Sequence, residues 1–192
     1  TERSITARWP LNNDANDQEG DRDGTLQGGP TFSSDRKEGS HSILLDGSDD
    51  YIDISDHPDL DVGTGDFSYS MWFKRDANAA TNLRLISKGG QDNADTGYAV
   101  WGSDTEVTAA LCNGQTRKFA TASHGGVGTW SHLAVTIDRS SGLMKLYING
   151  AEAAQTDISD WQGQDLSSTR NLRLGRSSTS FIGWDGSIDD VQ

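Results

Sequence analysis

The stretch WSHLAVTIDRSSGLMKLYING, residues 130–150, decides the fold. In both Ser131–Asp138 and Leu143–Ile148, apolar residues occupy every second position, and this period of two is typical of a half-buried β-strand. Asn149 and Gly150 end the stretch. Asn-Gly is the strongest short-range signal for a hairpin, because both residues tolerate the positive φ of a type I′ turn. Residues 130–150 therefore predict antiparallel strands joined by tight turns.

The same pattern extends outward over the rest of the chain. Short alternating runs are separated by turns rich in Gly, Asp, Ser and Asn, and the 22 Gly and three Pro favour tight turns over long helices. A single helical turn is expected at His57–Leu60. Eleven runs are predicted as strands: Ser42–Leu45, Tyr51–Ile54, Phe67–Lys74, Arg84–Lys88, Gly97–Trp101, Glu106–Cys112, Arg117–Ala122, Ser131–Asp138, Leu143–Ile148, Ala151–Thr156 and Asn171–Leu174. So many short strands in 192 residues predict one all-β domain over residues 1–192, a two-sheet antiparallel sandwich.

The charge of the chain is strongly negative and comes mainly from aspartate. The net charge is −13, and five of the 29 acidic residues are Glu, which leaves 24 Asp. A surface this acidic repels nucleic acid and anionic membranes, and it disfavours a polyanionic ligand unless a cation bridges the two. No stretch has the length of a transmembrane helix or the pattern of a signal peptide, and the single cysteine, Cys112, excludes an internal disulfide. We therefore expect no membrane insertion and no nucleic-acid partner.

Several motifs of the chain are similar to those of one family of β-sandwiches. In chain order they are RWPL (8–11), DGSDDYIDI (46–54), FSYSMWFK (67–74), LISKG followed by GY (85–89 and 97–98), WSHLAVT (130–136), LYING (146–150) and GSIDDV (186–191). Together they resemble the LamG-like (laminin G-like, type 3) group of the concanavalin A-like lectin/glucanase jelly rolls. The resemblance implies a jelly-roll sandwich whose last strand continues past Val191. We therefore expect a truncated last strand and a domain excised from a larger protein with neighbouring domains.

An acidic stretch near the start of the chain suggests a calcium site. Residues 14–24 concentrate carboxylate and amide oxygens, the ligands that calcium prefers, but no frame of the stretch matches an EF-hand loop. The family resemblance implies another geometry, in which an early acidic loop and the last strand converge on one structural Ca²⁺. Its ligands would be Asp17, Asp21, the carbonyl group of Gly47 and Asp189. The alternative is a solvated polar loop, with Asp189 hydrogen-bonded in a turn.

The six tryptophans divide by sequence context. Three lie in the family motifs and are expected to pack in the core or between the sheets: Trp9, Trp72 and Trp130. Three lie at a strand end or in loops and are candidates for the aromatic platforms that bind sugar rings: Trp101, Trp161 and Trp184. Polar residues around loops 76–83 and 89–96 are candidates for contacts with sugar hydroxyls: Asn82, Arg84, Asp92, Asn93 and Asp95. The alternatives are tryptophans that cap the ends of the sandwich and loops that are simply solvated.

Catalytic residues are not expected. Hydrolases that share this fold place two Glu and one Asp on one strand face, whereas the five Glu here are isolated from one another. The four His are scattered without metal-ligand spacing. The sequence thus predicts a non-catalytic, extracellular, carbohydrate-binding module of a secreted or cell-surface, adhesin-like protein, and the absence of an Asn-x-Ser/Thr sequon favours a bacterial one. Two alternatives stay open: a protein-interaction or architectural spacer domain, and an accessory domain of a polysaccharide-degrading enzyme.

Overall fold

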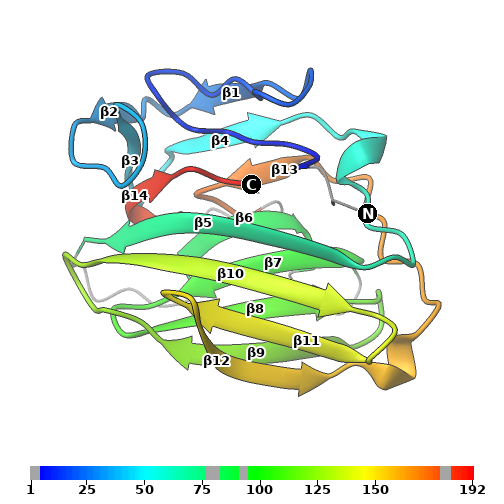
Figure 1. Ribbon diagram of the computed structural model, residues 1–192. Helices are drawn as coiled ribbons and strands as arrows, with labels where there is room; N and C mark the ends of the chain where they lie inside the picture. Colours follow the sequence, from blue (N-terminus) through cyan, green and yellow to red (C-terminus); the bar gives the residue numbers. More distant parts are fainter. Residues whose placement is uncertain (1–4, 77–82, 91–94, 178–182) are drawn as a thin grey trace.

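Two seven-stranded antiparallel sheets pack face to face in the computed structural model of the chain, which describes residues 5–76, 83–90, 95–177 and 183–192 (Figure 1). One sheet, here called the β7 sheet, has the strand order β1-β4-β13-β6-β7-β8-β9. The other, here called the β5 sheet, has the order β12-β11-β10-β5-β14-β3-β2. The predicted all-β jelly-roll sandwich is confirmed.

Most of the strands and helices in the structure were predicted from the sequence. The elements are β1 (Gly24–Gln27), β2 (Thr31–Ser33), β3 (Ser42–Asp46), β4 (Tyr51–Ile54), η1 (Pro58–Leu60), β5 (Phe67–Arg75), β6 (Leu83–Gly89), β7 (Gly97–Gly102), β8 (Glu106–Cys112), β9 (Arg117–Ser123), β10 (Trp130–Asp138), β11 (Leu143–Ile148), β12 (Ala151–Asp157), η2 (Ser159–Trp161), β13 (Leu172–Leu174) and β14 (Asp185–Asp189). Each of the eleven predicted strands is present, and the predicted helical turn is η1. Strand β14 was not among these eleven runs and was implied by the GSIDDV motif of the family, whereas the strands β1 and β2 and the helix η2 were missed, because each spans only three or four residues.

The hairpin that closes the deciding stretch has the predicted geometry. Asn149 and Gly150 have φ angles of 51° and 81°, as a type I′ turn requires, and they join β11 to β12. Along β10, Leu133, Val135 and Ile137 are buried while the residues between them face outward. Burial of each such side chain stabilises the fold by roughly 1.5–3 kcal/mol, so the alternation itself orients the sheet.

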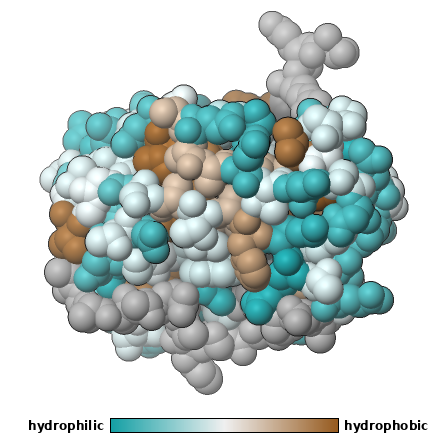
Figure 2. Space-filling view, turned by 90° about the horizontal axis from the view of Figure 1, so that it is seen from below, coloured by the Kyte–Doolittle hydropathy of each residue, from teal (hydrophilic) through white to brown (hydrophobic). Residues whose placement is uncertain are grey.

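The two sheets also close on each other at their edges. Strand β9 lies against β11 and β12 of the other sheet, and the hydroxyl group of Thr156 donates to the carbonyl group of Phe119. Figure 2 shows this side of the sandwich from below, where apolar residues run across the middle of the face between hydrophilic ones. At the opposite side, the amide of Trp9 donates to the carbonyl oxygen of Val191 at 2.8 Å, so the first and last described segments lie side by side.

Candidate ligand-binding face

The outer face of the β7 sheet carries arginine and aromatic side chains on neighbouring strands. The register aligns Arg173, Ser87, Ala99, Ala110 and Phe119 in one row across five strands, and it aligns Arg84, Trp101, Thr108 and Thr121 in a second row. Because side chains alternate between the two faces of a strand, both rows point away from the core. We call the following set the arginine–aromatic band: Tyr51, Arg173, Arg176, Arg84, Trp101, Phe119 and Arg117.

Each aromatic ring of the band is covered by at least one guanidinium group. The guanidinium carbon of Arg84 lies 4.5 Å from the ring centre of Trp101, and that of Arg117 lies 5.3 Å from the ring centre of Phe119. Arg173 and Arg176 each lie 4.9 Å from the ring centre of Tyr51. A cation over an aromatic face contributes about 0.5–2 kcal/mol, depending on its desolvation. These contacts hold the long arginine side chains in defined positions.

Trp101 and Phe119 form an accessible aromatic pair in the band. Their rings meet edge to face, with centres 5.7 Å apart and planes at 73°. Phe119 is 41% exposed and Trp101 is half-buried. Beside them, the hydroxyl groups of Thr108 and Thr121 lie 2.8 Å apart at the surface. The face thus offers ring surfaces, hydroxyl groups and N–H donors together.

The interior of the band has a positive local charge. Burial and, to a smaller extent, the positive charge of Arg117 together lower the pKa of Arg84 to about 10. Arg84 therefore stays charged at neutral pH although it is buried. Asp53 forms an ion pair with Arg173 at 2.8 Å. Beneath these side chains, Ser87, Ala99 and Ala110 form a floor of small buried residues.

Of the predicted ligand-binding residues, the structure brings Trp101 and Arg84 together. Asp95 lies apart from them and forms an ion pair with Arg170 at 3.2 Å. Three predicted residues lie outside the described part of the chain: Asn82, Asp92 and Asn93. Sequence reasoning missed Phe119 and Arg117, although their period-two spacing placed both on one face of the predicted strand Arg117–Ala122.

The expectation of exposed rings is wrong for Trp161 and Trp184. Trp161 is 2% exposed, because the polar residues around it occupy the outward side of one 3-10 turn while the indole joins the core. Trp184 is 0% exposed and packs edge to face on Phe73 with ring centres 5.8 Å apart. Its indole N–H donates to the carbonyl group of Lys74 at 3.2 Å. Both tryptophans complete the core.

The expectation of core packing is confirmed for Trp9 and wrong for Trp72 and Trp130. Trp9 is buried, whereas Trp72 and Trp130 are half-buried on the outer face of the β5 sheet. Lys37 lies 4.6 Å from the ring centre of Trp72, and His132 packs edge to face on the same ring. A shallow hollow of about 470 Å³ forms there, lined by Glu38, Trp72, His132, Asn149, Gly150 and Asp190. The ring of Trp72 is thus covered by the protein's own lysine.

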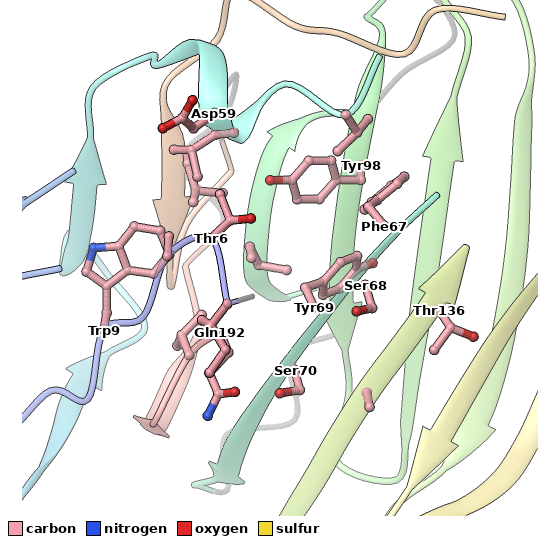
Figure 3. Close-up of a pocket in the computed structure, with 18 of the residues that line it drawn as sticks. Thr6, Trp9, Asp59, Phe67, Ser68, Tyr69, Ser70, Tyr98, Thr136 and Gln192 are labelled. Carbon is pink, nitrogen blue, oxygen red and sulfur yellow. The ribbon is translucent and has the colours of Figure 1, made fainter. Parts of the chain in front are cut away.

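A cavity of about 720 Å³ lies along an open edge of β5 (Figure 3). In Figure 3, Phe67, Tyr69 and Tyr98 lie together on one side and Trp9 on the other. Strand β14 pairs with Trp72–Arg75 of β5, Gln192 exchanges two hydrogen bonds with Ser70, and no described strand pairs with Phe67–Tyr69 on that side. The cavity therefore lies beside the part of β5 that has no strand neighbour on that side among the described residues.

The chemistry of this cavity is mainly apolar. Burial raises the pKa of Tyr69 and of Tyr98, and the hydroxyl group of Tyr69 has no hydrogen-bond partner among the described residues. The two carboxylates in the lining are already engaged, since Asp59 accepts from Arg22 at 2.6 Å and Asp66 accepts from the amide of Arg139 at 2.7 Å. Both carboxylates of the lining therefore have protein partners, and its other polar side chains include those of Ser68, Ser70 and Thr136.

Of the two predicted calcium ligands in the early loop, Asp17 is bonded to protein groups and Asp21 is exposed. The carboxylate of Asp17 accepts from the amides of Arg8 and Glu19 at 2.9 and 3.0 Å and from the Nε of Arg22 at 2.7 Å. Burial opposes ionisation of Asp17, but these bonds lower its pKa on balance. The side chain of Asp21 is 89% exposed, 3.7 Å from His57. Asp17 thus binds the guanidinium group of Arg22, where the resemblance implied that it binds Ca²⁺.

The two remaining predicted ligands lie at opposite ends of a strand pair. Asp46, next to Gly47, pairs with Asp185, and β14 then runs four residues to Asp189, about 13 Å at ~3.3 Å per residue. One ion cannot bridge that distance, so the four predicted residues do not fit one calcium ion. Asp189 is fully buried, and its Oδ2 accepts from the amides of Lys37 and Glu38 at 2.7 and 2.9 Å, which is the alternative reading of this residue.

Two other features bear on a cation. The Oδ1 of Asp189 has no hydrogen-bond partner in the described chain. Within those same ranges, one group of three carboxylates could hold a metal: Asp46, Asp49 and Asp50, in the turn between β3 and β4. Burial raises the pKa of Asp50, and the charges of Asp46 and Asp49 raise it further. Sequence reasoning missed this group, whose signal was three Asp within five residues.

Comparison with known proteins fits this architecture. A family model of the concanavalin A-like lectin/glucanases superfamily, laminin G type 3, matches residues 46–192. The chain belongs to this superfamily. The predicted resemblance is therefore confirmed, and the band lies on a lectin/glucanase sandwich. No curated protein matches the chain. In the part of the chain that the structure describes, no helix has the length and apolarity to cross a bilayer.

Solved structures with a similar fold include one complete module. Domain 4 of AbnA, a GH43 extracellular arabinanase from Geobacillus stearothermophilus, in complex with arabinotriose, has a TM-score of 0.72 at 21% identity, with 98% of this chain and 90% of that chain covered. A similar fold is found in the binding domain of botulinum neurotoxin DC in complex with rat synaptotagmin II, with a TM-score of 0.71 at 14% identity and with 98% of this chain and 48% of that chain covered. The same neurotoxin domain in complex with SialylT has a TM-score of 0.72 at 13% identity, with 97% of this chain and 46% of that chain covered. This lectin/glucanase chain thus spans about half of the neurotoxin binding domains.

Proposed function

We propose that this chain is a non-catalytic carbohydrate-binding module and that the arginine–aromatic band is its binding face. The observation that carries the proposal is the pair Trp101 and Phe119, two accessible rings held edge to face on the outer face of the β7 sheet. Sugar rings bind by laying their C–H faces on aromatic rings while polar groups nearby fix the hydroxyls. The hydroxyl groups of Thr108 and Thr121 and the guanidinium groups of Arg84 and Arg117 are placed for the second role.

The fold supports the same function. The AbnA module, which shares the fold over nearly its whole length, is described in complex with arabinotriose. The neurotoxin binding domains include a complex with a protein, synaptotagmin II, so a protein ligand is the second candidate. The hydroxyl groups of Thr108 and Thr121 beside the accessible rings favour a carbohydrate, because a sugar needs polar partners for its hydroxyls next to an aromatic face.

A glycan array followed by calorimetric titration with the polysaccharides that bind tests the proposal. Trp101→Ala and Phe119→Ala should each weaken binding about tenfold or more, as removal of a central aromatic contact does. Trp130→Ala is the matched control, since Trp130 is a half-buried indole on the outer face of the other sheet. Binding lost equally in all three variants, or no binding to any glycan, would contradict the proposal. Release of reducing ends from a bound polysaccharide would contradict its non-catalytic part.

A structural calcium ion and an extracellular location are further parts of the proposal. The unpartnered Oδ1 of Asp189 and the turn with Asp46, Asp49 and Asp50 support a search for the ion. Calorimetric titration with Ca²⁺ and melting temperatures with and without a chelator test it, and no change in either would remove calcium from the proposal. Antibody detection of the protein on intact cells and in the culture medium tests a secreted, adhesin-like parent, whereas detection in lysed cells alone would contradict it.

A further inference from the structure

Hydroxyl and carboxylate groups lie beside the aromatic pair of the band. The register places Trp101, Thr108 and Thr121 next to one another on β7, β8 and β9. Two residues away along β8 and β9, it pairs Glu106 with Ser123. Because side chains two residues apart on a strand share a face, these side chains all lie on the outer face of the β7 sheet. We call the four polar ones the hydroxyl–carboxylate patch: Glu106, Thr108, Thr121 and Ser123.

The hydroxyl–carboxylate patch is open to solvent. Glu106, Thr121 and Ser123 are exposed, and Thr108 is half-buried. Glu106 lies two residues from Thr108, which is about 7 Å along β8 at ~3.3 Å per residue. On β9, Phe119 lies two residues from Thr121. A sugar ring that lies against the aromatic pair therefore has the patch within reach of its hydroxyl groups.

The hydroxyl–carboxylate patch has more hydrogen-bond acceptors than donors. The hydroxyl groups of Thr108 and Thr121 lie 2.8 Å apart and hydrogen-bond to each other. Each hydroxyl group has one donor and two acceptor sites, so the bonded pair keeps one donor site and three acceptor sites. The carboxylate of Glu106 only accepts, and among the described residues it has no ion-pair or hydrogen-bond partner. The patch therefore suits a ligand whose groups donate hydrogen bonds.

The arginines of the band already have protein partners. Arg84 is buried against the ring of Trp101, and Arg173 is paired with Asp53 at 2.8 Å. A carboxylate or sulfate ester on a sugar brings acceptors and a negative charge, and it would face the acceptors and the negative charge of Glu106. A free sugar hydroxyl group donates to the same acceptors and carries no charge. The patch therefore distinguishes hydroxyl groups from anionic substituents.

Resting on the proposed function, we infer that this face binds an uncharged polysaccharide and that Glu106 selects it. A sugar ring lies against the aromatic pair, and its free hydroxyl groups donate to Glu106 and to the bonded pair of Thr108 and Thr121. A hydrogen bond to an ionised acceptor is about twice as strong as one between neutral groups. Glu106 therefore strengthens the binding of a hydroxyl group and opposes an anionic substituent at the same position.

Matched polysaccharides test the inference. Calorimetric titration would compare an oligogalacturonate with its carboxyl-reduced form, and a sulfated galactan with its desulfated form, so that each pair differs in its anionic group. The uncharged member of a pair should bind about tenfold or more tightly than its anionic counterpart, because like charges oppose each other across the contact.

Variants assign the selectivity to the hydroxyl–carboxylate patch. Glu106→Gln keeps an acceptor oxygen and removes the charge, so it should weaken binding of the uncharged member about threefold and strengthen binding of the anionic member by a similar factor. A merely structural role of Glu106 would change both affinities in the same direction. Thr121→Val removes one hydroxyl group at an exposed position and should weaken binding of the uncharged member about two- to tenfold.

The matched controls lie on the other sheet. Glu152→Gln on β12 and Thr31→Val on β2, both at exposed positions, should change neither affinity. If the anionic member binds as tightly as the uncharged one or more tightly, and Trp101→Ala abolishes both, the inference fails while the proposed function stands. Affinities that Glu106→Gln leaves unchanged or shifts in one direction would also overturn the inference. If no member of any pair binds, both fail.

Discussion

The guanidinium group of Arg84 lies 4.5 Å above the ring of Trp101, and the arginine is only 9% exposed. The side chain therefore acts as a cover for the indole as well as a charge. Arg84→Ala would remove this cover, and we expect it to lower the free energy of unfolding by about 1–3 kcal/mol through lost packing and cation–π contact. Urea unfolding followed by circular dichroism measures the change. Arg36→Ala at the exposed β2–β3 loop is the control, and equal effects of the two variants would contradict a special role for the stack.

The pair of Arg22 and Asp17 replaces a predicted metal. Both side chains are buried, and the Nε of Arg22 lies 2.7 Å from the Oδ2 of Asp17. Arg22→Ala therefore leaves an uncompensated carboxylate and should lower the free energy of unfolding by about 3–5 kcal/mol. Asp17→Asn should also destabilise the fold. Asp21→Asn, at an exposed position in the same loop, should have no measurable effect. If Asp17 and Asp21 instead ligated one ion, both substitutions would abolish the same calcium-dependent stabilisation.

The fold could be predicted from sequence because alternation is a direct consequence of strand geometry. Trp72 alternates with Met71 and Phe73 along β5, and it lies on the face opposite to them. The motif argument assigned the same tryptophan to the core and was wrong. A motif records that a residue type recurs at a position, whereas alternation determines which way its side chain points.

The binding face was harder to predict, since it depends on which strands become neighbours. Trp101 and Phe119 are 18 residues apart and meet because β7, β8 and β9 are adjacent. Exposure of loop tryptophans was also unpredictable from local polarity, as Trp161 shows, because one turn can point a ring into the core while its neighbours are solvated. The calcium geometry failed for the same reason, as ligand convergence requires the register of β3 and β14.

His124 should make the fold sensitive to mild acid. Its Nδ1 accepts from the amide of Gly126 at 3.1 Å, its Nε2 contacts the carbonyl oxygen of Ser103 at 3.1 Å, and the ring packs on Phe73. Burial lowers the pKa of His124 below its usual 6.5. The unfolded chain then takes up the proton first, so stability is complete above pH 6.5 and is lost as pH falls through the lower native pKa, by at most ~1.4 kcal/mol per pH unit.

Urea unfolding at pH 7.5, 6.5 and 5.5 measures this dependence. Burial also lowers the pKa of His132, so both histidines contribute to the slope. His124→Gln should retain the bond to Ser103 and reduce the slope, whereas His41→Gln, beside β3, is the control and should leave it unchanged. A slope unaffected by His124→Gln would show that this ring does not remain neutral in the native state.

Asp189 should be more stabilising as a neutral group than as an anion. Its Oδ2 accepts two amide N–H bonds from the β2–β3 loop while its Oδ1 has no partner among the described residues. Burial raises the pKa of Asp189 above its usual value. The contribution of the neutral acid is therefore complete below the unfolded-state pKa of ~3.9 and is lost as pH rises through the native pKa.

Asp189→Asn keeps an oxygen for the two loop amides and removes the charge. The difference in melting temperature between Asp189→Asn and the native protein should favour the variant more at pH 7.5 than at pH 4.5. Asp189→Ala leaves both loop amides without an acceptor. It should be destabilised at either pH by about 1–3 kcal/mol for each of the two amides. If Asp189→Asn is instead less stable, and the deficit is larger at pH 7.5, the carboxylate must be ionised and compensated in the native state. A bound cation would supply that compensation, and titrating Ca²⁺ into the native protein and the Asn variant would then separate a metal at Asp189 from an uncompensated buried acid.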